Sequence, residues 1–166
     1  MTVYLDMDGV LADFFGKVEE VYHVDHWKEL NMDVVIAEIQ NTNFFLKLDE
    51  FPTASKLVRE VDDMTAGDWG ICSSLLRGDH FNSAYWKRRW LEERDFIPRE
   101  WKKLVFTPNK EKYSRASFTG EPNILVDDKY SNVDKFTNAG GIGIRYQANE
   151  DSLEYVLERI ETSLRS

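Results

Sequence analysis

Short apolar runs alternate along the chain with longer segments in which apolar residues recur every three or four positions. Apolar runs begin at residues 3, 69, 104, 123 and 142, and they predict short buried strands. The longer spacing predicts helices over 10–22, 33–40, 79–93 and 131–138, one that begins behind Pro52-Thr53 and ends at Gly67, and an amphipathic helix over 153–164. This alternation predicts an α/β fold with a doubly wound, mostly parallel sheet covered on both faces.

The segment between Asp13 and Trp69 contains no second apolar run typical of a core strand. We therefore expect residues 14–68 to form a small helical cap and a return helix, inserted after the first strand. Residues 1–13 and 69–166 should form the Rossmann-like core. At 166 residues, of which 42% are hydrophobic, the chain suits one compact domain with a small insertion.

The first apolar run ends in two carboxylates, Asp6 and Asp8, on alternate positions just before Gly9. In a strand these side chains project to the same face, and the carboxyl end of a buried strand is where open α/β sheets bind ligands. Two carboxylates so close together repel unless a cation lies between them, and Mg²⁺ prefers such oxygen ligands. A calcium loop is excluded, because its glycine does not directly follow the second carboxylate.

Three later runs also end in groups that suit phosphate chemistry. Residues 69–74 end in the hydroxyls of Ser73 and Ser74, residues 104–110 end at Lys110, and residues 123–128 end in Asp127 and Asp128. The order acid–acid, hydroxyl, lysine, acid–acid over residues 3–134 resembles the four motifs of the haloacid dehalogenase superfamily in its phosphatase branch.

Within that superfamily the chain is similar to the 5'(3')-deoxyribonucleotidase family. The similarity lies in residues 6–14, in Asn43-Phe44-Phe45 with the following Leu48 to Ala54, in Ile71-Cys72-Ser73-Ser74 and in Thr107-Pro108-Asn109-Lys110. Two positions depart from the family pattern: Pro108 stands where the family has arginine, and Thr53 where it has glycine. The missing arginine bears on nucleotide selectivity and leaves the phosphoryl chemistry intact.

The resemblance implies a magnesium-dependent phosphomonoesterase that works through a phospho-aspartyl intermediate. Asp6 would be the nucleophile, and Asp8 the general acid and base, with its backbone carbonyl on the metal. Ser73 and Ser74 would hold phosphoryl oxygens, and Lys110, or Lys112 if the loop register differs, would neutralise charge. Asp128 is expected to bind Mg²⁺ directly, with Asp127 as an additional or supporting ligand and Asn132 orienting a metal-bound water.

Three aromatic residues have two interpretations. By pattern alone Phe14, Phe44 and Phe45 are typical of core packing, but they match the family's base-and-sugar pocket. The resemblance therefore implies a small-molecule nucleotide as substrate, with Phe14 the first candidate to contact it.

Charge and composition limit the other partners. A net charge of −9 argues against a long nucleic-acid surface, which needs basic stripes, so no polymeric nucleic acid is expected. The cations of the cluster Trp86-Lys87-Arg88-Arg89-Trp90 fan around a helix instead of forming a stripe, and the three histidines lack zinc-ligand spacing.

A single cysteine, Cys72, excludes an internal disulfide framework. No signal or membrane-spanning segment is visible, so the expected location is cytoplasmic. The oligomeric state is left open, with a homodimer as one option.

Three other activities are compatible with this fold. Dehalogenation is disfavoured, because that reaction needs neither Asp8 nor a magnesium carboxylate pair. A phosphatase with another substrate shares all four motifs: the acidic charge and a small cap argue against polynucleotide ends, and a general small-molecule phosphatase stays open. A non-catalytic phosphate-binding module would not need the full set of reactive residues.

Overall fold

The computed structural model describes residues 1–166 and contains one parallel five-stranded sheet. Its strands are β1 (Val3–Leu5), β2 (Trp69–Ser73), β3 (Leu104–Phe106), β4 (Ile124–Asp127) and β5 (Ile142–Arg145), in the order β3-β2-β1-β4-β5. The chain winds outward from β1 to β3 and then crosses back to β4 on the other side of β1. This confirms the predicted doubly wound fold, and it places the ligand-binding crevice of such sheets at the carboxyl ends of β1 and β4.

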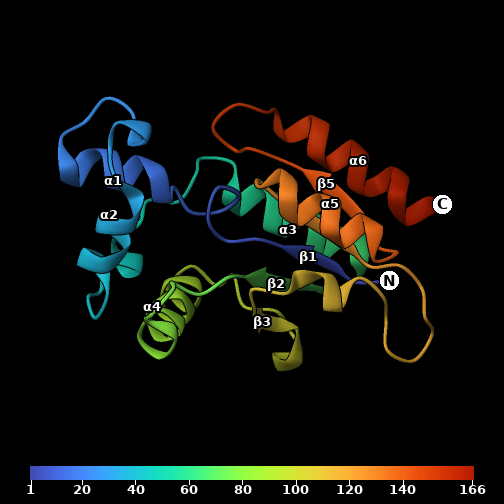
Figure 1. Ribbon diagram of the computed structural model, residues 1–166. Helices are drawn as coiled ribbons and strands as arrows, with labels where there is room; N and C mark the ends of the chain where they lie inside the picture. Colours follow the sequence, from blue (N-terminus) through green and yellow to red (C-terminus); the bar gives the residue numbers. More distant parts are fainter.

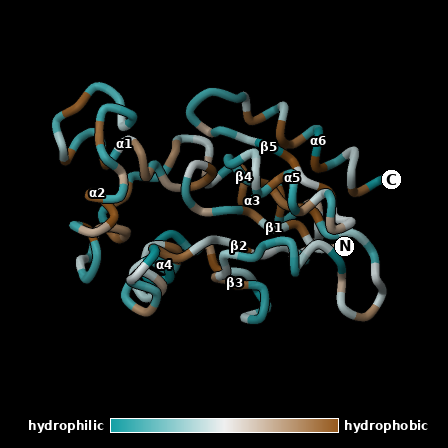
Figure 2. Tube along the Cα trace, in the orientation of Figure 1, coloured by the Kyte–Doolittle hydropathy of each residue, from teal (hydrophilic) through white to brown (hydrophobic).

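Helices cover both faces of the sheet. Helices α3 (Ala54–Thr65) and α6 (Leu153–Arg165) pack against each other on one face, and α5 (Tyr130–Asn138) covers β4 and β5 on the other (Figure 1). Successive strand residues accordingly enter different apolar clusters: Leu5 belongs to the larger one, whereas Tyr4 packs with Phe136 of α5. The trace of α6 alternates between hydrophobic and hydrophilic residues, as expected for a helix with one buried face (Figure 2).

The segment after β1 projects beyond the carboxyl ends of the strands and contributes no strand to the sheet (Figure 1). It comprises α1 (Phe14–Tyr22), η1 (Trp27–Glu29), α2 (Met32–Ile39) and η2 (Phe44–Lys47). Two chain segments join this region to the sheet, and backbone hydrogen bonds connect them. The amide of Asp13 donates to the carbonyl of Asp49, and the amide of Phe51 donates to the carbonyl of Leu11, both at 2.9 Å. That residues 14–68 act as a separate cap stays a prediction.

The predicted helix over 10–22 is wrong in its first four residues, because α1 begins at Phe14. Residues 9–12 instead form a tight turn in which the amides of Leu11 and Ala12 both donate to the carbonyl of Met7, at 2.8 and 2.9 Å. Residues 10–12 are fully buried, so their apolar character reflects core packing. Asp13 then caps α1 by accepting a hydrogen bond from the amide of Gly16.

Three elements remain, all between β2 and β4 in the chain. They are α4 (His80–Glu93), η3 (Trp101–Lys103) and η4 (Lys110–Tyr113), which precede or follow β3 along the chain. None of the helices combines the length and the apolar character needed to cross a bilayer.

Candidate active site

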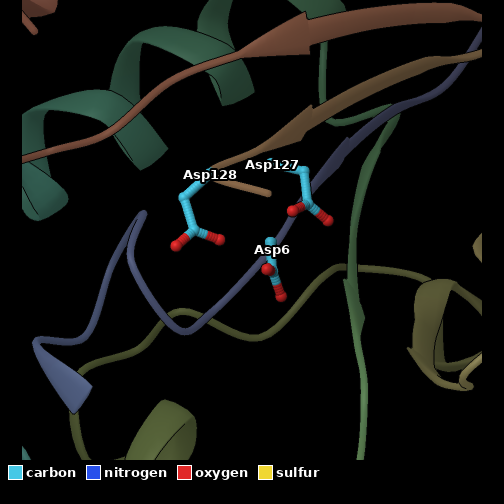
Figure 3. Close-up of side chains that lie close together, drawn as sticks. All are labelled: Asp6, Asp127 and Asp128. Carbon is cyan, nitrogen blue, oxygen red and sulfur yellow. The ribbon is translucent and has the colours of Figure 1, made fainter. Parts of the chain in front are cut away.

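Three carboxylates meet where β1 and β4 end. Asp6 directly follows β1, Asp127 ends β4, and the amide of Asp6 donates to the carbonyl of Val126 at 2.9 Å, which fixes the two strand ends side by side. One oxygen from each of Asp6, Asp127 and Asp128 lies within 4.8 Å of the others (Figure 3). The predicted convergence of the first and fourth motifs is therefore present.

Burial and the charges of neighbouring carboxylates raise the pKa values of two members of this cluster, Asp6 and Asp128. Burial raises the pKa of Asp6 to about 6, although Lys110 acts against it, and burial with the charges of Asp6 and Asp127 raises the pKa of Asp128 to about 8. A bound cation would relieve this repulsion.

The hydrogen bonds distinguish the two aspartates of the fourth motif. Asp127 is fully buried, and its carboxylate accepts bonds from the Lys110 ammonium, the Lys129 amide and the Asn132 side chain. The carboxylate of Asp128 accepts none and remains free to ligate a metal. Asn132 donates to Asp127, and its expected role in orienting a metal-bound water stays a prediction.

Gly9 lets Asp128 approach the first motif. Its φ is +83°, in the region that favours glycine. A Cβ added at this position would lie 2.2 Å from Asp128 Oδ2. A larger residue at this position would therefore displace the Asp128 carboxylate.

Lys110 lies inside the cluster, as predicted. Its Nζ is 3.1 Å from Asp6 Oδ1 and 2.6 Å from Asp127 Oδ2, and its side chain is 2% exposed. Burial opposes the charge of Lys110, but Asp6 and Asp127 outweigh burial and raise its pKa. Lys112, the alternative, is exposed.

The two oxygens of Asp8 have different environments. Oδ2 accepts a hydrogen bond from the Nζ of Lys87 at 2.8 Å, whereas Oδ1 is buried without any partner. Burial raises the pKa of Asp8, although Lys87 acts against it. Lys87 thus fixes the orientation of a carboxyl group whose second oxygen makes no hydrogen bond.

Sequence reasoning missed Lys87. The cations of its cluster do fan around the helix as predicted, with Arg88 and Arg89 exposed, but the spacing did not indicate that Lys87 points into the core, with 1% of its side chain exposed. The signal was available: Lys87 shares the buried stripe of α4 with Ser83, Trp90 and Leu91 at helical spacing. A lysine in an apolar stripe needs a buried anionic or polar partner.

The two predicted hydroxyls lie in different environments. Ser73 is fully buried, and its Oγ accepts a hydrogen bond from Lys87 at 3.0 Å. Ser74 is part-exposed and donates to the carbonyl of Thr107 at 3.3 Å. Their contact with phosphate stays a prediction.

The three phenylalanines form one group beside the site. The ring of Phe14 stacks on that of Phe45 with centroids 5.8 Å apart and meets that of Phe44 edge-on at 5.6 Å. Phe44 and Phe45 are buried in the main apolar cluster, and Lys87 Nζ lies 4.8 Å from the Phe45 ring centroid. Core packing thus holds for Phe44 and Phe45, and contact of the group with substrate stays a prediction.

Comparison with solved structures places this arrangement in a known fold. A HAD (haloacid dehalogenase) family hydrolase from Deinococcus radiodurans R1, crystallised with bound phosphate and sodium, superposes with a TM-score of 0.50. The match covers 96% of this chain and 87% of that one, at 14% sequence identity. This chain has the HAD fold. No family model matches the sequence.

The HAD fold explains why residues distant in sequence converge. Each motif follows one of the four strands β1 to β4, and parallel strands present their carboxyl ends at the same edge. The likeness bears on the fold, so the reaction must be argued from the residues themselves.

Proposed function

We propose that the protein is a magnesium-dependent phosphomonoesterase that hydrolyses nucleoside monophosphates through a phospho-aspartyl intermediate. The observation on which this rests is the environment of Asp6. Its Oδ1 accepts from the amide of Met7 at 2.8 Å and contacts Lys110, while its Oδ2 makes no hydrogen bond. The carboxylate is thus fixed at one oxygen, and the other is available as a nucleophile.

The reaction would proceed in two steps. An oxygen of Asp6 attacks phosphorus, the bond from phosphorus to the leaving oxygen breaks, and Asp8 gives that oxygen its proton. Asp8 then takes a proton from water, whose oxygen attacks the acyl phosphate and releases inorganic phosphate and free Asp6. Such acid–base assistance is worth about 10²–10⁴-fold, and Lys87, which holds Asp8 Oδ2 at 2.8 Å, would fix the carboxyl group for this role.

The donor set fits Mg²⁺. Asp6 and Asp128 would hold the ion, together with the backbone carbonyl of Asp8, and Asp127 would support them through its bonds to Lys110 and Asn132. When bound, the ion would offset the charge of the phosphoryl group and of the clustered carboxylates. The HAD hydrolase from Deinococcus radiodurans was crystallised with bound phosphate and sodium, so a protein of the same fold binds an anion and a cation.

The nucleotide assignment rests on the sequence resemblance and on the aromatic group. Phe14 is part-exposed beside Phe45, which lies against Lys87 at the site. An apolar ring next to the phosphate site suits a base or a deoxyribose. Pro108, exposed after β3, lacks the side chain that the related family uses there.

Phosphate release from a panel of substrates tests the proposal. Ribo- and deoxyribonucleoside 5'- and 3'-monophosphates, sugar phosphates, p-nitrophenyl phosphate and a 5'-phosphorylated oligonucleotide should be compared in Mg²⁺ and in EDTA. We expect mononucleotides to be the best substrates, with activity lost in EDTA. Equal rates on sugar phosphates would leave only a general phosphatase, and full activity after exhaustive chelation would contradict the metal.

A further inference from the structure

Lys87 is a buried lysine that the proposed reaction does not use directly. It comes from the middle of α4, yet its ammonium contacts both the loop after β1 and the loop after β2. With 1% of its side chain exposed, it is shielded from solvent, and the Phe45 ring covers it at 4.8 Å.

The ammonium of Lys87 has no donor left for a substrate. A lysine has three N–H donors, and three acceptors lie within hydrogen-bond distance: Asp8 Oδ2 at 2.8 Å, Ser73 Oγ at 3.0 Å and the Ser74 carbonyl at 2.6 Å. Binding a phosphoryl oxygen would require one of these bonds to break. Lys110 differs, because its two carboxylate contacts leave a third donor free.

We infer that Lys87 is the positioning residue for proton transfer: it holds Asp8 by Oδ2 and so fixes the orientation of the carboxyl group that protonates the leaving oxygen of the substrate. This inference rests on the proposed function, because it takes Asp8 as the general acid. Through Ser73 and Ser74 the same ammonium ties this acid to the loop expected to hold the phosphate. Acid and phosphoryl group would therefore keep a fixed relative position.

Comparing substrates with different leaving groups distinguishes a role in proton transfer from a merely structural role, because only the former depends on the leaving group. A nucleoside oxygen departs poorly without a proton, whereas p-nitrophenolate departs readily as the anion. Loss of a correctly placed acid should therefore reduce kcat/KM for a nucleoside monophosphate far more than for p-nitrophenyl phosphate. We expect Lys87→Met to lose about 100-fold on the nucleotide, within the usual range for acid–base assistance, and less than about 10-fold on the aryl ester. Arg88→Met, one position along α4 and exposed, is the matched control and should keep wild-type rates.

A double variant covers the case in which Lys87→Met does not fold. Removing the buried cation alone leaves Asp8 without its partner, but Asp8→Asn with Lys87→Met removes both charges together. If Lys87 acts through Asp8, the double variant should match Asp8→Asn within about threefold, because a non-additive pair acts as one unit.

The outcomes separate the two proposals. An active wild type in which Lys87→Met slows both esters equally, or changes neither, would refute the positioning role alone. A double variant at least tenfold slower than Asp8→Asn would do the same. A wild type that cleaves no phosphate monoester would refute the proposed function, and the role of Lys87 with it.

Discussion

In EDTA, the protein should lose stability as the pH rises from 5 to 8, and Asp128→Asn should remove much of that loss. The cause is the raised pKa of Asp128, about 8 in the fold against 3.8 for a free carboxyl group. An acid whose pKa is higher in the folded state binds its proton more tightly there. Its stabilising contribution is complete below about pH 4 and falls as the pH rises through about 8.

The size of the effect follows from the gap between these pKa values. At about 1.4 kcal/mol for each pH unit, the gap corresponds to at most about 5–6 kcal/mol. Asp128 is part-exposed, so solvent screening reduces this, and we expect about 2–3 kcal/mol. For a chain of this length that is a melting temperature lower by about 5–10 °C.

Thermal unfolding followed by circular dichroism, at pH 5 and pH 8 in EDTA, measures this directly. Wild type should lose about 5–10 °C more than Asp128→Asn between the two pH values. Mg²⁺ at pH 8 should then raise the melting temperature of the wild type and not that of the variant. Asp63→Asn, which removes an exposed carboxylate without side-chain hydrogen bonds, is the control and should follow the wild type. Identical pH dependence of wild type and Asp128→Asn would show that the carboxylate cluster is not under the repulsion described above.

Three further predictions concern catalysis. Asp6→Asn should fold but lose turnover, because an amide cannot form the acyl phosphate; a tenth of wild-type activity, without deamidation, would overturn the nucleophile. Asp8→Asn should lower kcat by about 10²–10⁴-fold with little change in KM, as measured by steady-state kinetics, and a defect confined to KM would contradict the acid–base role. Deoxyribonucleotides should exceed ribonucleotides about tenfold or more in kcat/KM, because a 2'-hydroxyl buried without a partner costs roughly 1–3 kcal/mol; equal values would exclude an apolar sugar pocket.

Much of the fold could be predicted because the inner strands β1, β2 and β4 of the parallel sheet are buried on both faces. Such strands appear in the sequence as continuous apolar runs, and all five runs became strands. The polar residues that follow these runs then had to meet, since parallel strands end at one edge. Asp6, Asp128 and Lys110 were therefore placed together correctly from sequence alone.

Two errors have a common physical cause. Val10 to Ala12 continue an apolar spacing into α1, but they are buried as a turn because Gly9 redirects the chain after β1. Lys87 belongs to a helix, where the direction of a side chain depends on how the whole helix is rotated against the sheet. Neither the turn nor that rotation can be predicted from the local spacing of apolar residues, because both depend on contacts between distant segments.

The charges of the completed site are consistent with a divalent ion. Four carboxylates surround the end of β1, and two buried lysines face them: Asp6, Asp8, Asp127 and Asp128 against Lys87 and Lys110. With all six groups ionised, two negative charges remain, which one divalent cation balances and a monovalent cation does not. Without a cation, burial is the main cause of the raised pKa values of Asp6 and Asp128, and the charges of neighbouring carboxylates add to it. The missed lysine therefore affects the expected metal as well as the acid: without Lys87 the excess would be three charges, and the preference for a divalent ion would not follow from the site.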